Sequence, residues 1–419
     1  MKHPSQHIWL LVLIGSIALD SYSQQIQMGL SRTNITPLEP VMMSGYAARK
    51  TPSTGVHDSL YTAALCFSDG NQKALMITCD VIGFSHEQAD QLSARIAENT
   101  GIPGENILIT ATHTHGAPSI GTYGTLSFEA NRKYMDFLEK KIVAISRSAS
   151  ENLQDVKIGR GRGSCQLNIN RRAQFADGSI WLGRNSEGPC DHDVDILKIE
   201  SMRGDLLAVF VNWACHGTAS GQDNYQITGD WPGISARYLE EELGQETVIY
   251  VTAGASGDIN PLYGPNDKFM EIQAVGYNLA QEVLQVLPGI TSSTQEQLNV
   301  TQKSLVLPGK KRLDNRYPPK GFETGEDVEV RLSALRFGEI VFTGISGEVM
   351  TEIGMQIKEG SPSKAPFVIT HCNGSSGYIC TDKAFPEGGY EVMVTRLMPG
   401  AEKTITDSLL ELVYNLDGH

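Results

Sequence analysis

Two histidines, His113 and His115, are separated by one residue in the run Ala-Thr-His-Thr-His-Gly at positions 111–116. The apolar residues just before them, 107–110, predict a buried strand, and side chains two apart on a strand lie on one face. A histidine pair at the end of a buried strand is suited to ligate a metal ion or to exchange protons. Rim histidines bonded to the backbone would give the same pattern, so the pair alone leaves both interpretations open.

Other strand-like runs also end in polar residues beside glycine. Residues 206–213 lead into His216-Gly217, and residues 247–251 lead into the loop 254–261, which contains Asp258 and Asn260. Further polar loops contain the following residues: Asn168, Asn170, Arg171 and Arg172; Glu348 after Gly347; and Tyr378 after Gly377. Imidazole and carboxylate are the usual zinc ligands, and a catalytic zinc site needs about three of them plus water. A calcium site would require more carboxylate ligands.

Each of these residues also has a purely structural explanation. Glu348 would begin a helix and interact with its dipole. His216 would be a hydrogen-bonded core residue, and Tyr378 would be a packing residue. Arg171 would belong to a solvated basic pair. Asp230 reads more readily as a helix cap than as a catalytic acid.

Strands and helices alternate along the chain, which predicts an α/β fold of layered mixed β-sheets flanked by helices. Ser85 opens a helix with a capping-box pattern. Further helices are expected at 232–243, 270–287, 348–358 and 402–416, and strands at 61–67, 74–79, 107–112, 193–200, 206–213, 247–251, 328–336, 340–343 and 367–371.

Composition indicates one large globular domain and excludes some classes of partner. The chain has 419 residues, of which 40% are hydrophobic and 20% charged, and it contains no long linker or repeat. Its net charge of -14 and its pI near 5.2 argue against binding to nucleic acid and against electrostatic docking on anionic membranes.

The amino terminus predicts export. Lys2 and His3 precede an apolar run from Ile8 to Leu19, and a small-x-small pattern ends at Ser23. We therefore expect residues 1–23 to be a signal peptide and residues 24–419 to be a secreted or periplasmic catalytic domain without a transmembrane segment.

The seven cysteines are too few and too irregular for a disulfide scaffold. Cys66, Cys79 and Cys215 lie in strand-like runs and are most simply core residues. Whether Cys372 and Cys380 form a disulfide bond stays an open question at this point.

Several short motifs occur in the order found in the neutral/alkaline non-lysosomal ceramidases. The motifs are Thr-His-Thr-His at 112–115, Asn-Ile-Asn-Arg at 168–171, His-Gly-Thr at 216–218, Gly-Asp-Ile-Asn-Pro at 257–261, Gly-Glu at 347–348 and Gly-Tyr-Ile at 377–379. From about Met28 onward the chain resembles the catalytic domain of that family.

The resemblance implies a fold of the neutral ceramidase type and one zinc ion per chain. It assigns His113, His216, Glu348 and Tyr378 as the zinc ligands. His115 would face the substrate and stabilise an oxyanion, and Arg171 and the second pocket tyrosine, Tyr390, would orient the substrate.

The chain departs from the family pattern in two respects. Asn260 stands where the family has its proposed nucleophilic serine, and an amide side chain cannot act as the nucleophile. We therefore expect a zinc-bound water to attack, with Asp258 or His115 moving its proton; a shifted nucleophile, Ser256, is the other reading. The family's carboxyl-terminal immunoglobulin-like domain is also not expected here.

The sequence thus predicts a secreted zinc-dependent hydrolase that cleaves an amide such as that of an N-acyl sphingosine. Two alternatives stay open. One is a zinc hydrolase of the same fold acting on a polar, glycan-derived amide, ester or glycoside. The other is a non-catalytic binding protein for a small molecule or lipid.

Overall fold

The largest sheet has eight strands and is built from the apolar hairpins that the sequence predicts. The computed structural model describes residues 25–416, apart from 123–125, 265–267, 315, 317–320 and 364–365. The strand order is β12 (Val248–Ala253), β10 (Leu206–Trp213), β9 (Asp193–Ser201), β6 (Gln154–Ser164), β1 (Gln27–Asn34), β3 (Tyr61–Ser68), β4 (Lys73–Cys79) and β5 (Ile107–Ala111).

A second sheet of four strands packs against the first. Its order is β14 (Leu298–Arg312), β15 (Phe322–Phe337), β16 (Ile340–Ile345) and β18 (Phe367–Ile369). Aromatic side chains from both sheets meet between them: Phe67 packs on Phe337, and Phe210 packs on Phe342 and Phe367. A continuous apolar core therefore joins the two sheets.

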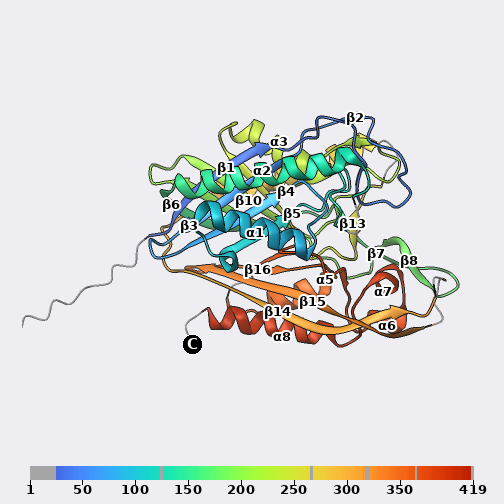
Figure 1. The fold of residues 1–419 in the computed structure, drawn as a ribbon. Coiled ribbons are helices and arrows are strands. Elements are labelled where there is room, and N and C mark those ends of the chain that lie inside the picture. Colours follow the sequence, from blue (N-terminus) through green and yellow to red (C-terminus); the bar gives the residue numbers. More distant parts are fainter. Residues whose placement is uncertain are drawn as a thin grey trace, which may run out of the picture.

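Helices cover the outer face of each sheet. They are α1 (His86–Thr100), α2 (Glu129–Glu151), α3 (Asp230–Leu243) and α4 (Lys268–Val286) on the larger sheet, and α5 (Thr351–Gly360) and α8 (Ala401–Asn415) on the smaller. Figure 1 shows α1 and α2 in front of strands of the larger sheet, and α8 along the bottom, beside β14 and β15. The α/β class with layered mixed sheets is thereby confirmed, in the layer order helix, sheet, sheet, helix.

Short elements gather beside the ends of the strands. A three-stranded sheet has the order β13 (Ile259–Pro261), β7 (Asn168–Gln174) and β8 (Ile180–Asn185). Two-residue strands pair as β2 (Gly55–Val56) with β11 (Gln226–Ile227) and as β17 (Glu348–Val349) with β19 (Tyr378–Ile379). The remaining elements are the 3₁₀ turns η1 (Gly104–Asn106) and η2 (Leu287–Gly289) and the short helices α6 (Ala384–Glu387) and α7 (Tyr390–Val394).

The two edges of the eight-stranded sheet approach each other. Strands β12 and β5 stand at opposite ends of the strand order, yet they are in contact. The hydroxyl of Thr78 on β4 donates to the carbonyl of Val251 on β12 at 2.8 Å. Loops that follow the two edge strands therefore open into one region of the molecule.

Most sequence-predicted elements are confirmed, including the capping box in which the Ser85 side chain accepts from Gln88 N. Two interpretations were wrong. Residues 168–172 form part of strand β7 rather than a loop, because β13 and β8 supply backbone partners on both sides. Glu348 lies in β17, and helix α5 begins only at Thr351.

The structure answers the question about Cys372 and Cys380 that the sequence left open. All seven cysteines are free, so Cys372 and Cys380 do not form a disulfide bond. Both are buried, and burial raises the pKa of the Cys372 thiol to about 12. They serve as small apolar residues of the interior.

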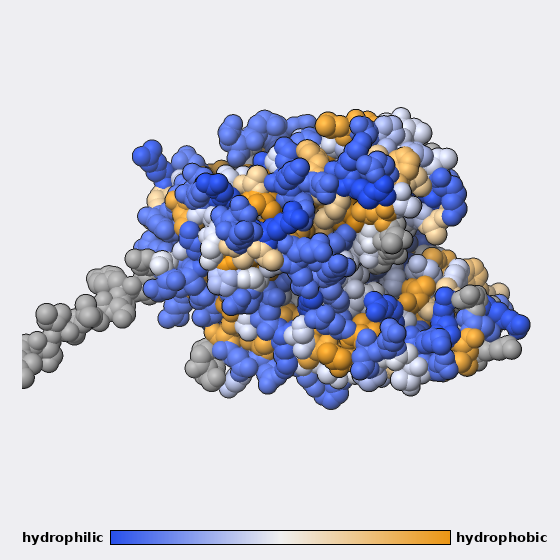
Figure 2. All heavy atoms as spheres, in the orientation of Figure 1, coloured by the Kyte–Doolittle hydropathy of each residue, from blue (hydrophilic) through white to orange (hydrophobic). Residues whose placement is uncertain are grey.

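The expected signal peptide, residues 1–23, lies outside the described residues and stays a prediction. Within residues 25–416, as far as they are described, no helix is both long and apolar enough to cross a membrane. Figure 2 shows hydrophilic residues over most of one face, with hydrophobic residues in scattered patches.

Candidate metal centre

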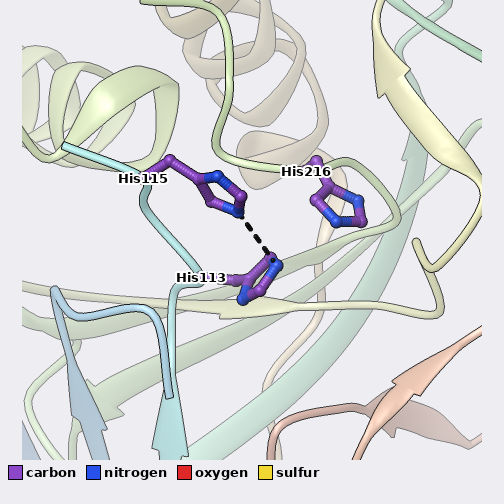
Figure 3. A group of neighbouring side chains, drawn as sticks. All are labelled: His113, His115 and His216. Atoms are coloured by element: carbon purple, nitrogen blue, oxygen red, sulfur yellow. Dashed lines mark hydrogen bonds between the residues drawn. The ribbon is translucent and has the colours of Figure 1, made fainter. Parts of the chain in front are cut away.

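Three histidines meet where strands of the larger sheet end. His113 and His115 follow β5, and His216 follows β10. Figure 3 shows their imidazoles gathered from these two segments, and one ring nitrogen of each lies within 4.8 Å of the others. His115 Nε2 and His113 Nε2 are 3.3 Å apart. The two loops are held in register by a bridge between Thr114 and Gly217 and by a hydrogen bond from His115 N to Gly217 O at 2.9 Å.

A carboxylate from the other half of the molecule completes the cluster. Glu348 Oε2 lies 3.3 Å from His216 Nε2 and 3.6 Å from His113 Nε2. Parallel pairing of β17 with β19 sets Glu348 directly opposite Tyr378. The backbone NH of Gly257 donates to Val349 O at 2.7 Å and so ties this small sheet to the loop after β12.

Backbone carbonyls determine which nitrogen of two imidazoles carries the hydrogen. His113 Nδ1 lies 2.6 Å from Ile82 O, and His216 Nδ1 lies 2.6 Å from Ser256 O. A carbonyl oxygen only accepts, so both rings carry their hydrogen on Nδ1 and present a lone pair at Nε2. Two lone pairs therefore face the Glu348 carboxylate, an arrangement that a cation between them would stabilise.

The spacing of these atoms fits zinc. Ligands placed tetrahedrally at the usual zinc distances of about 2.0–2.2 Å lie about 3.3–3.6 Å apart. The two separations between imidazole nitrogen and carboxylate oxygen, 3.3 and 3.6 Å, lie in that range. His113, His216 and Glu348 therefore form a ligand set whose imidazole–carboxylate spacing fits one such ion.

Burial keeps His216 and His115 in the neutral form, which is the form that binds metal. Burial and, second, the charge of Arg171 lower the pKa of His216 to about 4. Burial likewise holds the pKa of His115 well below its usual value. The imidazoles of His216 and His115 are therefore neutral at neutral pH. The Nδ1 atom of His115 is buried without a hydrogen-bond partner among the described residues.

Tyr378 and Arg171 lie beside these ligands. Arg171 Nη2 donates to the Tyr378 hydroxyl at 3.0 Å, and Nη1 lies 3.3 Å from His216 Nε2. Burial raises the pKa of Tyr378 well above its usual value, and the Glu348 carboxylate raises it further. The phenol is therefore neutral and close enough to the cluster to be a fourth ligand.

The loop after β12 places Asp258 and Asn260 differently from each other. Both Asp258 carboxylate oxygens accept hydrogen bonds, from Thr351 N at 2.8 Å and from Asn170 Nδ2 at 2.9 Å. Burial raises the pKa of Asp258 to about 6. Asn260 Oδ1 lies 3.3 Å from Arg171 Nη1. Asp258 thus joins α5 to β7, whereas Asn260 adjoins the arginine.

A cavity of about 540 Å³ opens onto the cluster. His113, His115, Glu348, Tyr378 and Tyr390 all contribute to its wall. Apolar and small polar residues form much of the remaining lining: Met43, Ser44, Ala47, Ile82, Ser119, Ile120, Thr122 and Val394. Its size is that of a site for one small organic molecule.

Sequence reasoning assigned no role to several residues around the cluster. The His371 ring stacks on His113 with centroids 3.9 Å apart. Arg49 clamps the loops through the carbonyls of Ser44 and Gly221, at 2.7 and 3.1 Å, and it also donates to His115 O. The sequence pattern at His371 is similar to that at His216, because His371 ends a predicted strand and lies three residues before a glycine. No sequence pattern marks Arg49.

Comparisons with known sequences agree with this geometry. The family described as neutral/alkaline non-lysosomal ceramidase, N-terminal, matches residues 26–266. The neutral ceramidase of Drosophila melanogaster is 26% identical over 288 residues, which cover 62% of this chain and 40% of that protein. Neutral ceramidase A of Dictyostelium discoideum is 27% identical over 261 residues, which cover 58% and 36%. The matches thus span about two fifths or less of the length of these relatives.

Solved structures share the fold over nearly the whole chain. The neutral ceramidase from Pseudomonas aeruginosa superimposes with a TM-score of 0.78 at 16% identity, covering 94% of this chain and 74% of that one. A ceramidase complexed with C2 gives a TM-score of 0.79 at 15% identity, covering 94% and 76%. The shared architecture includes the carboxyl-terminal part, where Glu348, Tyr378 and Tyr390 lie.

Proposed function

The chain belongs to the neutral/alkaline non-lysosomal ceramidase family, and we propose on that premise that it is a zinc-dependent amidohydrolase acting on N-acyl sphingosine-like lipids. The observation that carries the proposal is the convergence of His113 Nε2, His216 Nε2 and Glu348 Oε2. The Glu348 oxygen lies at zinc-ligand spacing from both imidazole nitrogens. His113 and Glu348 also belong to the wall of a cavity sized for an organic substrate.

Zinc would be held by His113, His216 and Glu348, with Tyr378 as the fourth ligand. When bound, zinc supplies a Lewis acid that polarises a carbonyl and lowers the pKa of water towards about 7. The side chains around it must then bind the acyl group, exclude other water and move one proton.

His115 is the residue we assign to proton movement. Its ring is neutral because burial lowers its pKa, and it lies on the cavity wall next to His113. Water attacks the amide carbon, the C–N bond breaks, and the proton passes through His115 to the departing nitrogen. The products are a fatty acid and a free amine.

Asp258 and Asn260 have supporting roles in this proposal. The Asp258 carboxylate is engaged by Thr351 and Asn170, so it positions the loop after β12 rather than moving the proton. Asn260 replaces the family's serine and contacts Arg171. Water is therefore the nucleophile, and Tyr390 on the cavity wall orients the substrate.

The first experiment combines metal content with hydrolysis. Zinc per chain is measured by plasma mass spectrometry on the wild type, on His113→Ala and on the control His86→Ala, whose histidine lies at the start of α1. The same proteins are tested on a fluorescent short-chain ceramide. We expect one zinc per chain and ceramide cleavage in the wild type and the control, and neither in His113→Ala.

Two results would contradict parts of the proposal. A wild type without zinc would exclude the metal mechanism. Zinc without ceramide cleavage would exclude the N-acyl sphingosine substrate and would favour polar amides, esters or glycosides.

A further inference from the structure

Glu391 is a buried carboxylate that sequence reasoning left without a role. Its side chain is 1% exposed. Its Oε1 accepts from Arg171 Nε at 2.7 Å, and its Oε2 accepts from Arg172 Nη1 at 3.1 Å. It lies on α7, next to Tyr390 of the cavity wall.

Arg171 connects this carboxylate to the proposed ligands. Its guanidinium side chain is 6% exposed. One end bonds Glu391, and the other end donates to the Tyr378 hydroxyl at 3.0 Å and lies 3.3 Å from His216 Nε2. A guanidinium has a rigid planar fork, so fixing Nε fixes where both Nη atoms point.

We propose that Glu391 is a positioning residue that acts through Arg171 on Tyr378 and His216. This inference rests on the proposed function. The negative charge of Glu391 offsets the positive charge of Arg171, which would otherwise lie uncompensated beside a second cation, the metal. Its Oε1 also fixes the Arg171 guanidinium through Nε, so that the Tyr378 phenol stays aimed at the cluster. Groups that orient the ligands of a metal in this way commonly change affinity or activity about 10–100-fold when removed.

Local backbone supports the same assignment. Gly389 has a φ of +100°, and a Cβ there would lie 2.7 Å from Arg172 Nη1. Arg172 also donates to Gly388 O at 2.9 Å and pairs with Glu387 at 3.0 Å. The turn before α7 thus needs glycine so that Arg172 can reach Glu391 from one side while Arg171 reaches it from the other.

The test is a double-variant cycle of Glu391→Gln, Arg171→Met and both together. Three quantities are measured: kcat and KM on the short-chain ceramide, and zinc affinity by competition with a chelator. We expect Glu391→Gln to lower kcat and zinc affinity about 10–100-fold, with KM changed less than about threefold. The double variant should be no worse than Arg171→Met alone, because Glu391 acts only through that arginine.

The control is Glu387→Gln, since Glu387 also pairs with Arg172 but is 47% exposed. The kcat, KM and zinc affinity of Glu387→Gln should stay within about twofold of the wild-type values. Glu391→Asp should recover part of the activity. If Glu391→Gln folds poorly, the double variant still answers the question, because it removes both buried charges together.

The outcomes separate this inference from the proposed function. Losses that multiply in the double variant, or a Glu391→Gln protein equal to the wild type, would overturn the inference while leaving a zinc hydrolase in place. A wild type that binds no zinc would instead overturn the proposed function and the inference with it.

Discussion

At the scale of single residues, burial sets the charge of the groups around the site. His216 and His115 are kept neutral by burial, and carbonyls of the backbone orient the His113 and His216 rings. A different consequence of burial appears at Asp80, which is 8% exposed. It accepts from Tyr61 N at 2.8 Å and from Thr112 Oγ1 at 3.2 Å, just before the segment of His113.

Asp80 should make stability fall as pH rises. Burial raises its pKa from 3.8 to about 6, so the folded protein keeps this proton longer than the unfolded chain does. Asp80 therefore contributes up to about 3 kcal/mol to the free energy of unfolding. This contribution is fully present below about pH 4 and is lost as the pH rises through 6. Urea unfolding at several pH values should show Asp80→Asn gaining stability on the wild type between pH 4 and 7.

The matched control is Asp136→Asn, an exposed change on α2. Its stability difference from the wild type should not vary with pH. An Asp80→Asn difference that is equally constant would show that the Asp80 carboxyl ionises alike in both states.

At the scale of elements, backbone hydrogen bonds between loops hold the proposed ligands in place. His216 N donates to Ile259 O at 3.1 Å, and His115 N donates to Gly217 O at 2.9 Å. The His216 loop is therefore fixed to both the His113 loop and β13. Such close packing of backbones leaves no room for a side chain at Gly217, where a Cβ would lie 2.8 Å from His113 O and from Thr114 Cα.

Gly217→Ala should therefore push the His113 and His216 loops apart. We expect a loss of about 1–3 kcal/mol in unfolding free energy. Zinc affinity, measured by chelator competition, should fall about tenfold or more. Gly55→Ala is the control, because a Cβ there meets nothing within 4 Å. Equal zinc affinity in the two variants would mean that this backbone contact does not hold the ligands.

At the scale of the whole molecule, the centre depends on how the two sheets pack. His113 and His216 follow strands of the larger sheet, whereas Glu348 follows β16 of the smaller one. The separation between imidazoles and carboxylate is thus set by the core between the sheets. Phe210 lies in that core, with ring centroids 5.2 Å from Phe342 and 5.3 Å from Phe367.

Phe210→Ala should loosen both the fold and the centre. Removing a fully buried phenylalanine leaves a cavity and costs about 3–5 kcal/mol of unfolding free energy. Zinc affinity should fall as well, because the two sheets hold different ligands. Phe175→Ala, at a side chain 49% exposed, should change the unfolding free energy by less than about 0.5 kcal/mol. Unchanged zinc affinity in a destabilised Phe210→Ala protein would argue against this coupling.

The α/β class, most strand and helix positions and the residue types of the centre could be predicted from the amino-acid sequence. Hydrophobic period and capping are local properties, and short motifs around His113, His216 and Glu348 can be read without a structure. Three contacts became visible only in the folded chain: β12 approaches β5, Glu348 pairs with Tyr378, and Arg171 meets Glu391. Those contacts join residues far apart in the chain, and they depend on sheet curvature and core packing, which no local pattern of residues specifies.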